Sequence, residues 1–398
     1  MSQDKISNQL NNILNGENIY KERVKYFRNL IKKYSFNPIW YAELSRCYIN
    51  LGLLEKATNA MQIAIHLSPT SRFISRSAAR LFLHIGDIDR AHHVLVHNPT
   101  LQYDPWLLAS EIAVNASRGR SSRFIKMGMS MVFSGNYSPF SFSELASAIG
   151  TKELESSRKK GKLFLEKSLI SPNDNSLSQA DWLMNNDKSL SLNFSNIQKP
   201  IFNFESDARY SFFKKEYQSA LESSIAWIGI MPFARTPINF AADIAYTYQN
   251  NYADAIKILQ IGLKANPKEL SFMNNLAYAY ALNGQTKEAD EILIKLLPLV
   301  SNERELYICA KATNGLNEYR KGNIEVGRKL YSESVNYAIQ VDAINLVHKA
   351  LLNNIREEIR ATHQCSTELL QLLDKLHTGN ERETEAMKNE INKMLSSL

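Results

Sequence analysis

Apolar residues recur at helical spacing on both sides of Gly284. Leu276 and Tyr280 share one helical face before this glycine, and Ala289 and Leu293 share one after it. Glycine commonly ends a helix, because it adopts the left-handed conformation without steric cost. The pattern predicts a helical hairpin with an apolar face on each helix. A single hairpin cannot bury both faces, so this one requires neighbours of the same kind.

The hairpin pattern recurs along the chain at a nearly fixed period. Ala255 and Leu259 precede Ala289 and Leu293 by 34 residues, and Ala220 precedes Ala255 by 35. A copy near the N-terminus keeps the same offsets at Tyr41, Leu44, Ser45, Tyr48, Gly52, Ala57, Met61, Ala64 and Pro69. A downstream copy keeps Gly315, Gly322, Gly327 and Tyr331. A period of this length predicts an array of stacked helical hairpins.

These positions resemble the tetratricopeptide repeat (TPR) family. The family signature places large residues such as Tyr246 and Tyr280 between hairpins, and small residues such as Ala255 and Ala289 where two helices approach closely. The resemblance implies an all-α fold, a right-handed superhelical solenoid of TPR-like helical hairpins with one irregular insertion. The low content of 15 Gly and 11 Pro also favours helix over sheet.

The repeat phase divides the chain into four segments. We expect a basic TPR-like array over 1–172, an irregular Ser- and Asn-rich insertion over 173–205, a second TPR-like array over 206–340, and C-terminal capping helices and a tail over 341–398. Helices at the ends of such arrays usually cover the exposed core.

The insertion 173–205 allows two interpretations. Alternating large apolar residues predict a small β-hairpin in it, at Leu190, Leu192 and Phe194 and then at Phe202 and Phe204. It is either a flexible surface segment or an arm that packs across the array or contacts a partner. The second interpretation rests on Trp182 and Phe194, because large aromatic side chains are costly to leave in water.

Positive charge is concentrated in the first half of the chain. The net charge is +7, and residues 1–199 contain 25 Lys and Arg against 16 Asp and Glu. Three basic runs carry it: Lys21, Arg23, Lys25, Arg28, Lys32 and Lys33; Arg118, Arg120, Arg123 and Lys126; and Arg158, Lys159, Lys160 and Lys162. They form either a solvated face or a surface for an acidic protein or a nucleic-acid backbone. The second and third runs lack the interleaved aromatic residues that single strands stack on.

The sequence contains no recognisable catalytic or cofactor motif. Phosphate-binding loops, dinucleotide-binding glycine motifs and nucleophile elbows are absent. His92, His93, His97 and His84 form the one histidine cluster, and His93 and His97 have a zinc-compatible spacing. No HExxH arrangement and no third ligand accompany them, so we expect an exposed helix face. We expect no enzymatic activity, no cofactor and no metal.

Three scattered cysteines and the apolar segments bear on localisation. Cys47, Cys309 and Cys365 form no CxxC motif and no disulfide framework, which predicts free thiols in a reducing cytoplasm. The start of the chain lacks the apolar core of a signal peptide. The longest apolar run, 225–234, is about half the roughly 20 residues that a membrane helix needs. We therefore expect a cytoplasmic protein with no membrane partner.

The TPR resemblance also implies where a partner binds. In this family the first helix of each hairpin lines a concave groove. The positions carried over are Arg46, Asn50, Arg76, Arg80, His84, Arg209, Phe213, Phe240, Tyr248, Asn274 and Tyr278. This groove would be basic at one end and aromatic at the other. The Lys and Asn clamp of chaperone-binding members is not found in phase.

We expect a non-enzymatic protein-binding scaffold or regulator. Its partner would be another protein, held through an acidic or mixed acidic and apolar segment. Arg46, Arg76 and Arg80 should share one wall with Glu43 as the nearest acid, while the later tyrosines grip apolar side chains. The alternative for these arginines is that they face solvent or pair within the array. The alternative function is a nucleic-acid-associated TPR-like protein that uses the basic N-terminal half, and self-association stays open.

Overall fold

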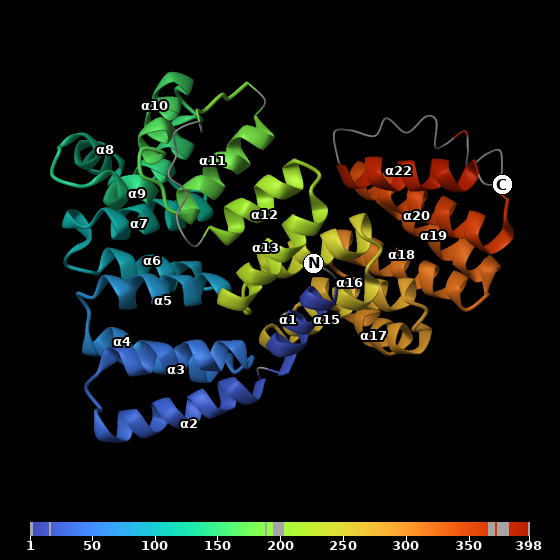
Figure 1. Ribbon diagram of the computed structural model, residues 1–398, viewed down its shortest axis with the longest axis horizontal. Coiled ribbons are helices and arrows are strands. Elements are labelled where there is room, and N and C mark those ends of the chain that lie inside the picture. The colour runs from blue at the N-terminus through green and yellow to red at the C-terminus, as the bar shows by residue number, and fades with distance from the viewer. Residues whose placement is uncertain are drawn as a thin grey trace. The chain divides into compact units, whose positions relative to one another are not determined.

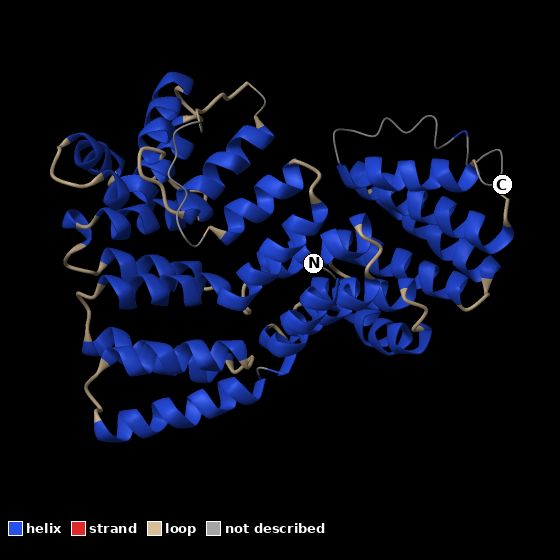
Figure 2. Cartoon of the chain, in the orientation of Figure 1, coloured by secondary structure: helices blue, strands red, loops and turns tan. Residues whose placement is uncertain are grey.

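The chain forms an all-α helical repeat fold (Figures 1 and 2). The structure, a computed structural model, describes residues 3–15, 17–187, 189–193, 203–364, 371 and 382–396. These residues contain no β-strand. The predicted fold class is confirmed as a helical repeat. Phe194, Phe202 and Cys365 lie outside the described residues.

The first compact unit in chain order, which we call unit A, comprises Asn15–Pro237. Its helices are α2 (Glu17–Lys33), α3 (Pro38–Asn50), α4 (Leu54–Leu67), α5 (Arg72–His84), α6 (Ile88–Val96), the short 3-10 helix η1 (Leu101–Tyr103), α7 (Pro105–Ser117), α8 (Ile125–Phe133), α9 (Pro139–Glu153), α10 (Arg158–Ser168), α11 (Asp174–Asn186), α12 (Phe204–Phe213) and α13 (Tyr217–Ile230).

The second compact unit, unit B, comprises Met1–Leu14 and Ile238–Leu398. Its helices are α1 (Gln3–Asn15), α14 (Arg235–Asp243), the π-helical turn η2 (Ile244–Tyr248), α15 (Tyr252–Ala265), α16 (Leu270–Leu282), α17 (Thr286–Leu299), α18 (Arg304–Arg320), α19 (Ile324–Gln340), α20 (Ile344–Thr362) and α22 (Arg382–Leu395). The four segments expected from the repeat phase stay a prediction.

Consecutive helices pack as antiparallel hairpins in both units. In unit A the pairs include α3 with α4, α5 with α6, and α12 with α13; in unit B they include α16 with α17 and α18 with α19. The first helices of successive hairpins also contact one another, as α3, α5 and α7 do in unit A and α16, α18 and α20 do in unit B. These first helices carry the residues that the sequence places in a groove.

The turn between the two helices of a hairpin requires a left-handed residue. Glycine supplies it at Gly284, with φ of +78°, and at Gly322, with φ of +86°. Asn250 lies 34 residues before Gly284 and has φ of +52°, and Lys215 lies 35 residues before Asn250 and has φ of +63°. The repeat therefore imposes this conformation even where glycine is absent, at a steric cost to a side chain such as lysine.

Small residues lie where the two helices of a hairpin approach. Ala57, Ala255 and Ala289 are fully buried. A Cβ atom added at Gly327 would lie 2.5 Å from Cδ2 of Tyr319, a distance that ordinary carbon contacts do not reach. The close approach predicted from the repeat pattern is therefore present.

The segment expected to be irregular is helical over its first part. Helix α11 begins with a capping box in which Asn173 and Ser176 satisfy each other's backbone N–H groups. The apolar residues of this segment join one buried cluster with the preceding helix: Leu165, Leu169, Leu177, Ala180, Leu183, Leu190 and Leu192. The expectation of an irregular insertion was therefore wrong for Asp174–Asn186. The expected β-hairpin was also wrong for 189–193, where Leu190 and Leu192 are buried without forming a strand.

Candidate partner-binding cavity

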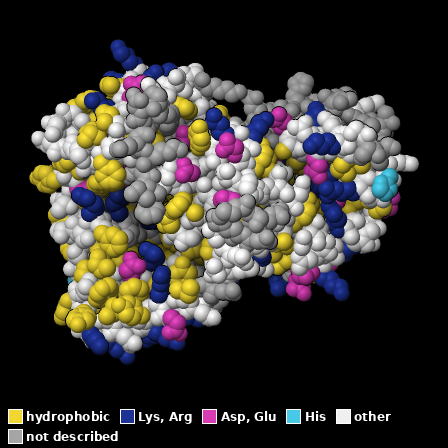
Figure 3. Space-filling model, in the orientation of Figure 1, with side chains coloured by type: hydrophobic (Ala, Val, Ile, Leu, Met, Phe, Trp, Pro, Cys, Tyr) yellow, Lys and Arg dark blue, Asp and Glu magenta, His cyan; other side chains and the backbone are white. Residues whose placement is uncertain are grey.

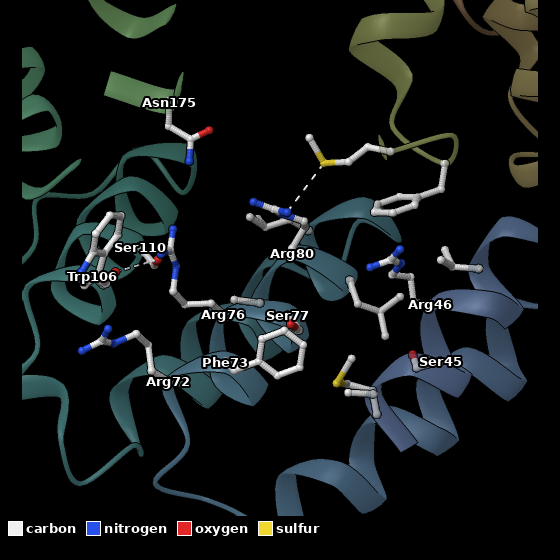
Figure 4. A pocket seen from close by; sticks show the side chains of 18 of the residues that line it. Ser45, Arg46, Arg72, Phe73, Arg76, Ser77, Arg80, Trp106, Ser110 and Asn175 are labelled. Carbon is white, nitrogen blue, oxygen red and sulfur yellow. Dashed lines mark hydrogen bonds between the residues drawn. The ribbon is translucent and has the colours of Figure 1, made fainter. Parts of the chain in front are cut away.

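A cavity of about 730 Å³ opens on the first helices of unit A (Figure 4). Residues from α3, α5 and α7 line it, together with Glu144 of α9, the start of α11 and the end of α13. Its size is typical of a ligand pocket, and it is large enough for a few side chains of a bound peptide. The first helices of adjacent hairpins thus form one concave surface, as the resemblance implied.

Three of the predicted groove residues line this cavity together. Arg46 comes from α3, and Arg76 and Arg80 lie one helical turn apart on α5 (Figure 4). Arg72, which the sequence analysis did not select, is also on the lining. The lining contains these four arginines and two glutamates, Glu43 and Glu144, so its net charge is +2.

The arginines differ in how far the protein neutralises them. Arg76 Nη2 lies 2.5 Å from Glu144 Oε2, and the Arg76 guanidinium lies over the Trp106 ring at 5.2 Å from its centroid. Arg72 Nε lies 2.5 Å from Asp104 Oδ2. Charge-assisted bonds of this length hold both side chains in place. The alternative of pairing within the array is therefore the outcome for Arg76 and Arg72.

Glu144 is the acid that the sequence analysis missed. Besides Arg76, its carboxylate accepts hydrogen bonds from Asn173 and Asn175, each at 2.7 Å. It lies 68 residues after Arg76 in the chain, so no local pattern identifies it. Glu43, the acid expected to lie nearest, forms a long ion pair with Arg46, with 3.8 Å between Arg46 Nη1 and Glu43 Oε2.

Arg80 is the least neutralised cation of the cavity. Its Nη1 lies 3.6 Å from the sulfur of Met231, and it forms no ion pair with any described carboxylate. Arg80 is exposed at its surface, although protein surrounds the guanidinium on several sides. This burial, together with repulsion from Arg76, lowers the pKa of Arg80, while Glu144 opposes the shift. The guanidinium remains charged in the neutral range, because an arginine pKa is ordinarily above 12.

Apolar side chains surround this charge. Phe73 on α5 is 48% exposed, and Ile230 at the end of α13 is 49% exposed. Both line the cavity. Hydrophobic side chains lie beside Lys and Arg on the face over α3 and α5 (Figure 3). Neither apolar residue was selected from the sequence, although Phe73 occupies a first-helix position directly after Arg72.

The remaining groove candidates of unit A do not line the cavity. Asn50 is buried, with 7% of its surface exposed. The His84 ring packs edge-on against Phe233, a lining residue, at 5.2 Å between centroids. Arg209 pairs with Glu205 and lies over the Trp227 ring, and Phe213 is 47% exposed. The expectation that Asn50 presents its side chain to a groove was therefore wrong, whereas for Arg209 and Phe213 it stays a prediction.

The groove candidates of unit B contact helices of their own unit. Asn274 is buried, and its Oδ1 accepts a hydrogen bond from Thr313 at 3.0 Å. The Tyr278 hydroxyl donates to Asn353 Oδ1 of α20 at 2.9 Å, so a partner would have to compete with α20 for it. Phe240 and Tyr248 are half-buried, and Tyr248 lies in η2.

The basic runs outside the cavity are partly paired. Arg118 lies 2.8 Å from Asp89, and Arg158 lies 2.8 Å from Asp187. Lys159 is exposed. The Arg158 pair is exposed and contributes little to stability, whereas the Arg118 side chain is only 17% exposed.

The histidines and cysteines show no catalytic arrangement. His93 and His97 are exposed and stack at 3.8 Å between ring centroids, and the described residues contain no group of three potential metal ligands. Burial raises the pKa of the Cys47 thiol to about 11, and does the same for Cys309. Both thiols are therefore protonated and poorly nucleophilic near neutral pH. No helix in the described part of the chain is long and apolar enough to span a membrane.

Comparison with known proteins supports the repeat assignment. A family model described as tetratricopeptide repeat matches residues 244–293, which include η2, α15 and α16 and reach into α17. This segment is similar to a tetratricopeptide repeat. It contains Gly284 and the greater part of the hairpin around this glycine, so the TPR resemblance is confirmed. No curated protein matches the chain.

Solved structures give a weaker likeness. The crystal structure of yeast Tom70 is 13% identical, with 100% of this chain and 97% of that chain covered and a TM-score of 0.33. The human IFIT1 dimer with PPP-AAAA is 14% identical, with 97% and 95% covered and a TM-score of 0.39. These identities and TM-scores are low, so the fold is described from the helices of this chain alone.

Proposed function

We propose that this TPR-like protein is a non-enzymatic, cytoplasmic protein-binding scaffold, and that the cavity of unit A takes an acidic and apolar segment of a partner protein. The observation that carries the proposal is Arg80, an exposed guanidinium on the cavity lining without a carboxylate partner among the described residues. The free thiols Cys47 and Cys309 support a reducing compartment.

A carboxylate is the group that Arg80 would bind most favourably. Its planar fork can donate two parallel hydrogen bonds to a carboxylate. A bound carboxylate would also offset the repulsion between Arg80 and Arg76. The acidic residue of the partner would therefore lie against Arg80.

The exposed apolar side chains define the rest of the partner segment. Phe73 and Ile230 would each lose water contact when an apolar side chain packs against them. A segment that alternates acidic and apolar residues would satisfy both the charge and the apolar surface. A lysine-rich or wholly polar segment would not.

The proposal is tested by selecting peptides from a random phage-displayed library with three forms of the full chain. Wild type should enrich peptides that combine Asp or Glu with large apolar residues. Arg80→Glu should lose this preference and enrich basic peptides, because the sign of the cavity charge changes. Lys159→Glu, an exposed substitution of the same charge change outside the cavity, should select the same peptides as wild type.

A synthetic consensus peptide gives the quantitative result. Its affinity should fall tenfold or more in Arg80→Glu, about 1.4 kcal/mol, with helicity unchanged by circular dichroism. Identical enrichment by wild type and Arg80→Glu would overturn the assignment of the cavity. Binding of an oligonucleotide with a steep loss of affinity in salt would favour the nucleic-acid alternative instead.

A further inference from the structure

The C-terminal helix α22 packs against first helices of unit B. It contacts α20, beside which it lies in Figure 1, and also η2 near the beginning of the array of unit B. Ile391 is fully buried and Met387 is 5% exposed. They join Leu352, Ile355 and Ile359 of α20 in one cluster. The helix therefore covers the side of the array on which a TPR protein would otherwise present its first helices.

The contacts of α22 have the form of a bound amphipathic helix. Met387, Ile391, Met394 and Leu395 follow the spacing i, i+4, i+7 and i+8, which places them on one face. Acidic residues on the edges meet basic residues of α20. Glu383 lies 2.5 Å from Lys349, and Glu390 lies 2.7 Å from Arg360.

Helix α20 is held far more strongly than α22. Glu358 of α20 accepts a hydrogen bond from the buried Tyr319 at 2.7 Å and pairs with Arg328. The two ion pairs of α22 have side chains that are 28–35% exposed, and pairs of this kind contribute little. Removal of α22 would therefore leave α20 in place as one wall of an open face.

One contact of α22 opposes its docking. Asp243, directly before η2, is close enough to Glu383 for their like charges to interact unfavourably. Lys349 lies beside Glu383 and compensates in part. A helix without an acid at this position could occupy the same face without that repulsion.

We propose that α22 is a removable internal ligand, and that the face it covers on α20 and η2 binds an amphipathic helix of a partner protein. That helix would carry large apolar residues at i, i+4 and i+7 and an acidic residue on the edge that meets Arg360. The binding face lies in unit B and is independent of the cavity of unit A.

The test uses a labelled peptide with the sequence of residues 382–396, added to the full chain. In wild type the attached helix competes at an effective concentration on the order of millimolar, so the peptide should bind weakly. In an Ile391→Asp chain the attached helix can no longer bury its central side chain. The peptide should then bind at least tenfold more tightly than it binds wild type.

Matched substitutions make the result specific. Asn392→Asp adds the same charge one residue later on the exposed side of α22, and should leave peptide binding as in wild type. A peptide carrying Ile391→Asp should bind none of the chains. If Ile391→Asp lowers the helicity of the whole chain, Glu390→Arg replaces it, since that change breaks the half-buried pair with Arg360 and leaves the apolar face of α22 intact.

The overturning result is a folded Ile391→Asp or Glu390→Arg chain that binds the peptide no better than wild type does. In that case α22 is a fixed cap of the array. Because the peptide assay involves unit B alone, such a failure leaves the Arg80 test of the proposed function unaffected.

Discussion

The first helices of the two units use the same repeat positions in opposite ways. In unit A they leave a cavity in which Arg80 has no described carboxylate partner and Phe73 is half exposed. In unit B the corresponding helices contact further helices of their own unit, and the Tyr278 hydroxyl is hydrogen-bonded to Asn353. A repeat position thus places a residue on the first helix of a hairpin, and the surrounding chain determines whether the space in front of its side chain is vacant.

The difference extends to how charge is used. The side chain of Glu357 in unit B is 1% exposed. Its carboxylate forms two ion pairs, one with Arg320 at 2.7 Å and one with Arg356 at 2.9 Å. Charge in unit B therefore holds helices together. In unit A, Glu144 neutralises Arg76 on the lining of a cavity, and Arg80 forms no ion pair with a described carboxylate.

The largest expected effect is on this buried network. Glu357→Ala leaves Arg356, which is 6% exposed at its side chain, without its carboxylate. Breaking a buried pair in this way should cost about 3–5 kcal/mol in the free energy of unfolding. Urea denaturation measures the loss. The control is Glu325→Ala, which removes an exposed acid paired with Arg328 and should cost about 1 kcal/mol or less. Equal losses in the two variants would mean that the network does not hold α20.

A smaller effect is expected in the cavity of unit A. Glu144→Gln removes the charge that neutralises Arg76, so two guanidinium groups would face an acidic peptide. The peptide should bind up to tenfold more tightly, about 1.4 kcal/mol, as measured by isothermal titration calorimetry. Glu155→Gln changes an exposed acid outside the cavity lining and should have no effect. Weaker binding by Glu144→Gln would show that its hydrogen bonds shape the site more than its charge does.

The turn residues provide a matched comparison of stability. Lys215 in unit A and Asn250 in unit B both have positive φ. Lys215→Gly should stabilise the chain by about 1 kcal/mol, because glycine adopts this conformation without steric cost. Asn250→Gly should change stability little, since asparagine tolerates the left-handed region. The melting temperatures of the two variants test this difference in stability. A Lys215→Gly variant that melts below wild type would contradict the prediction.

The smallest effect is a pH dependence of α22 docking. Burial and the nearby Glu383 raise the pKa of Asp243 to about 7, while a hydrogen bond from Tyr246 and the charge of Lys349 oppose the shift. The docked state therefore binds the Asp243 proton more tightly than the undocked state does. Docking should weaken as the pH rises through about 7.

Hydrogen–deuterium exchange of the α22 amides measures this dependence. After correction for the intrinsic rate, exchange should be faster at about pH 8 than at about pH 6. The difference should disappear in Asp243→Asn. An unchanged difference in that variant would assign the dependence to another group.

The sequence predicted the helical repeat more completely than it predicted the residues of the candidate site. Gly284 and the alanines at hairpin contacts follow from local sterics, so periodicity predicted them. Arg80 was found because its position in the repeat places it on the first helix of a hairpin, although the same reasoning failed for Asn50. Glu144 could not be found, because its contact with Arg76 depends on how hairpins stack. The helix α11 was missed because its capping box and apolar face lie in a segment whose Ser and Asn content is typical of loops.

Photo-crosslinking tests the contrast between the two units most directly. The photoreactive residue p-benzoylphenylalanine is placed at Phe73 of α5 or at Phe240 of α14, and each chain is irradiated with the acidic and apolar consensus peptide. The account predicts a cross-link from position 73, lost when Arg80→Glu is added, and none from position 240. A cross-link from position 240 alone would contradict it, because the partner would then bind the unit whose first helices are covered by their own chain.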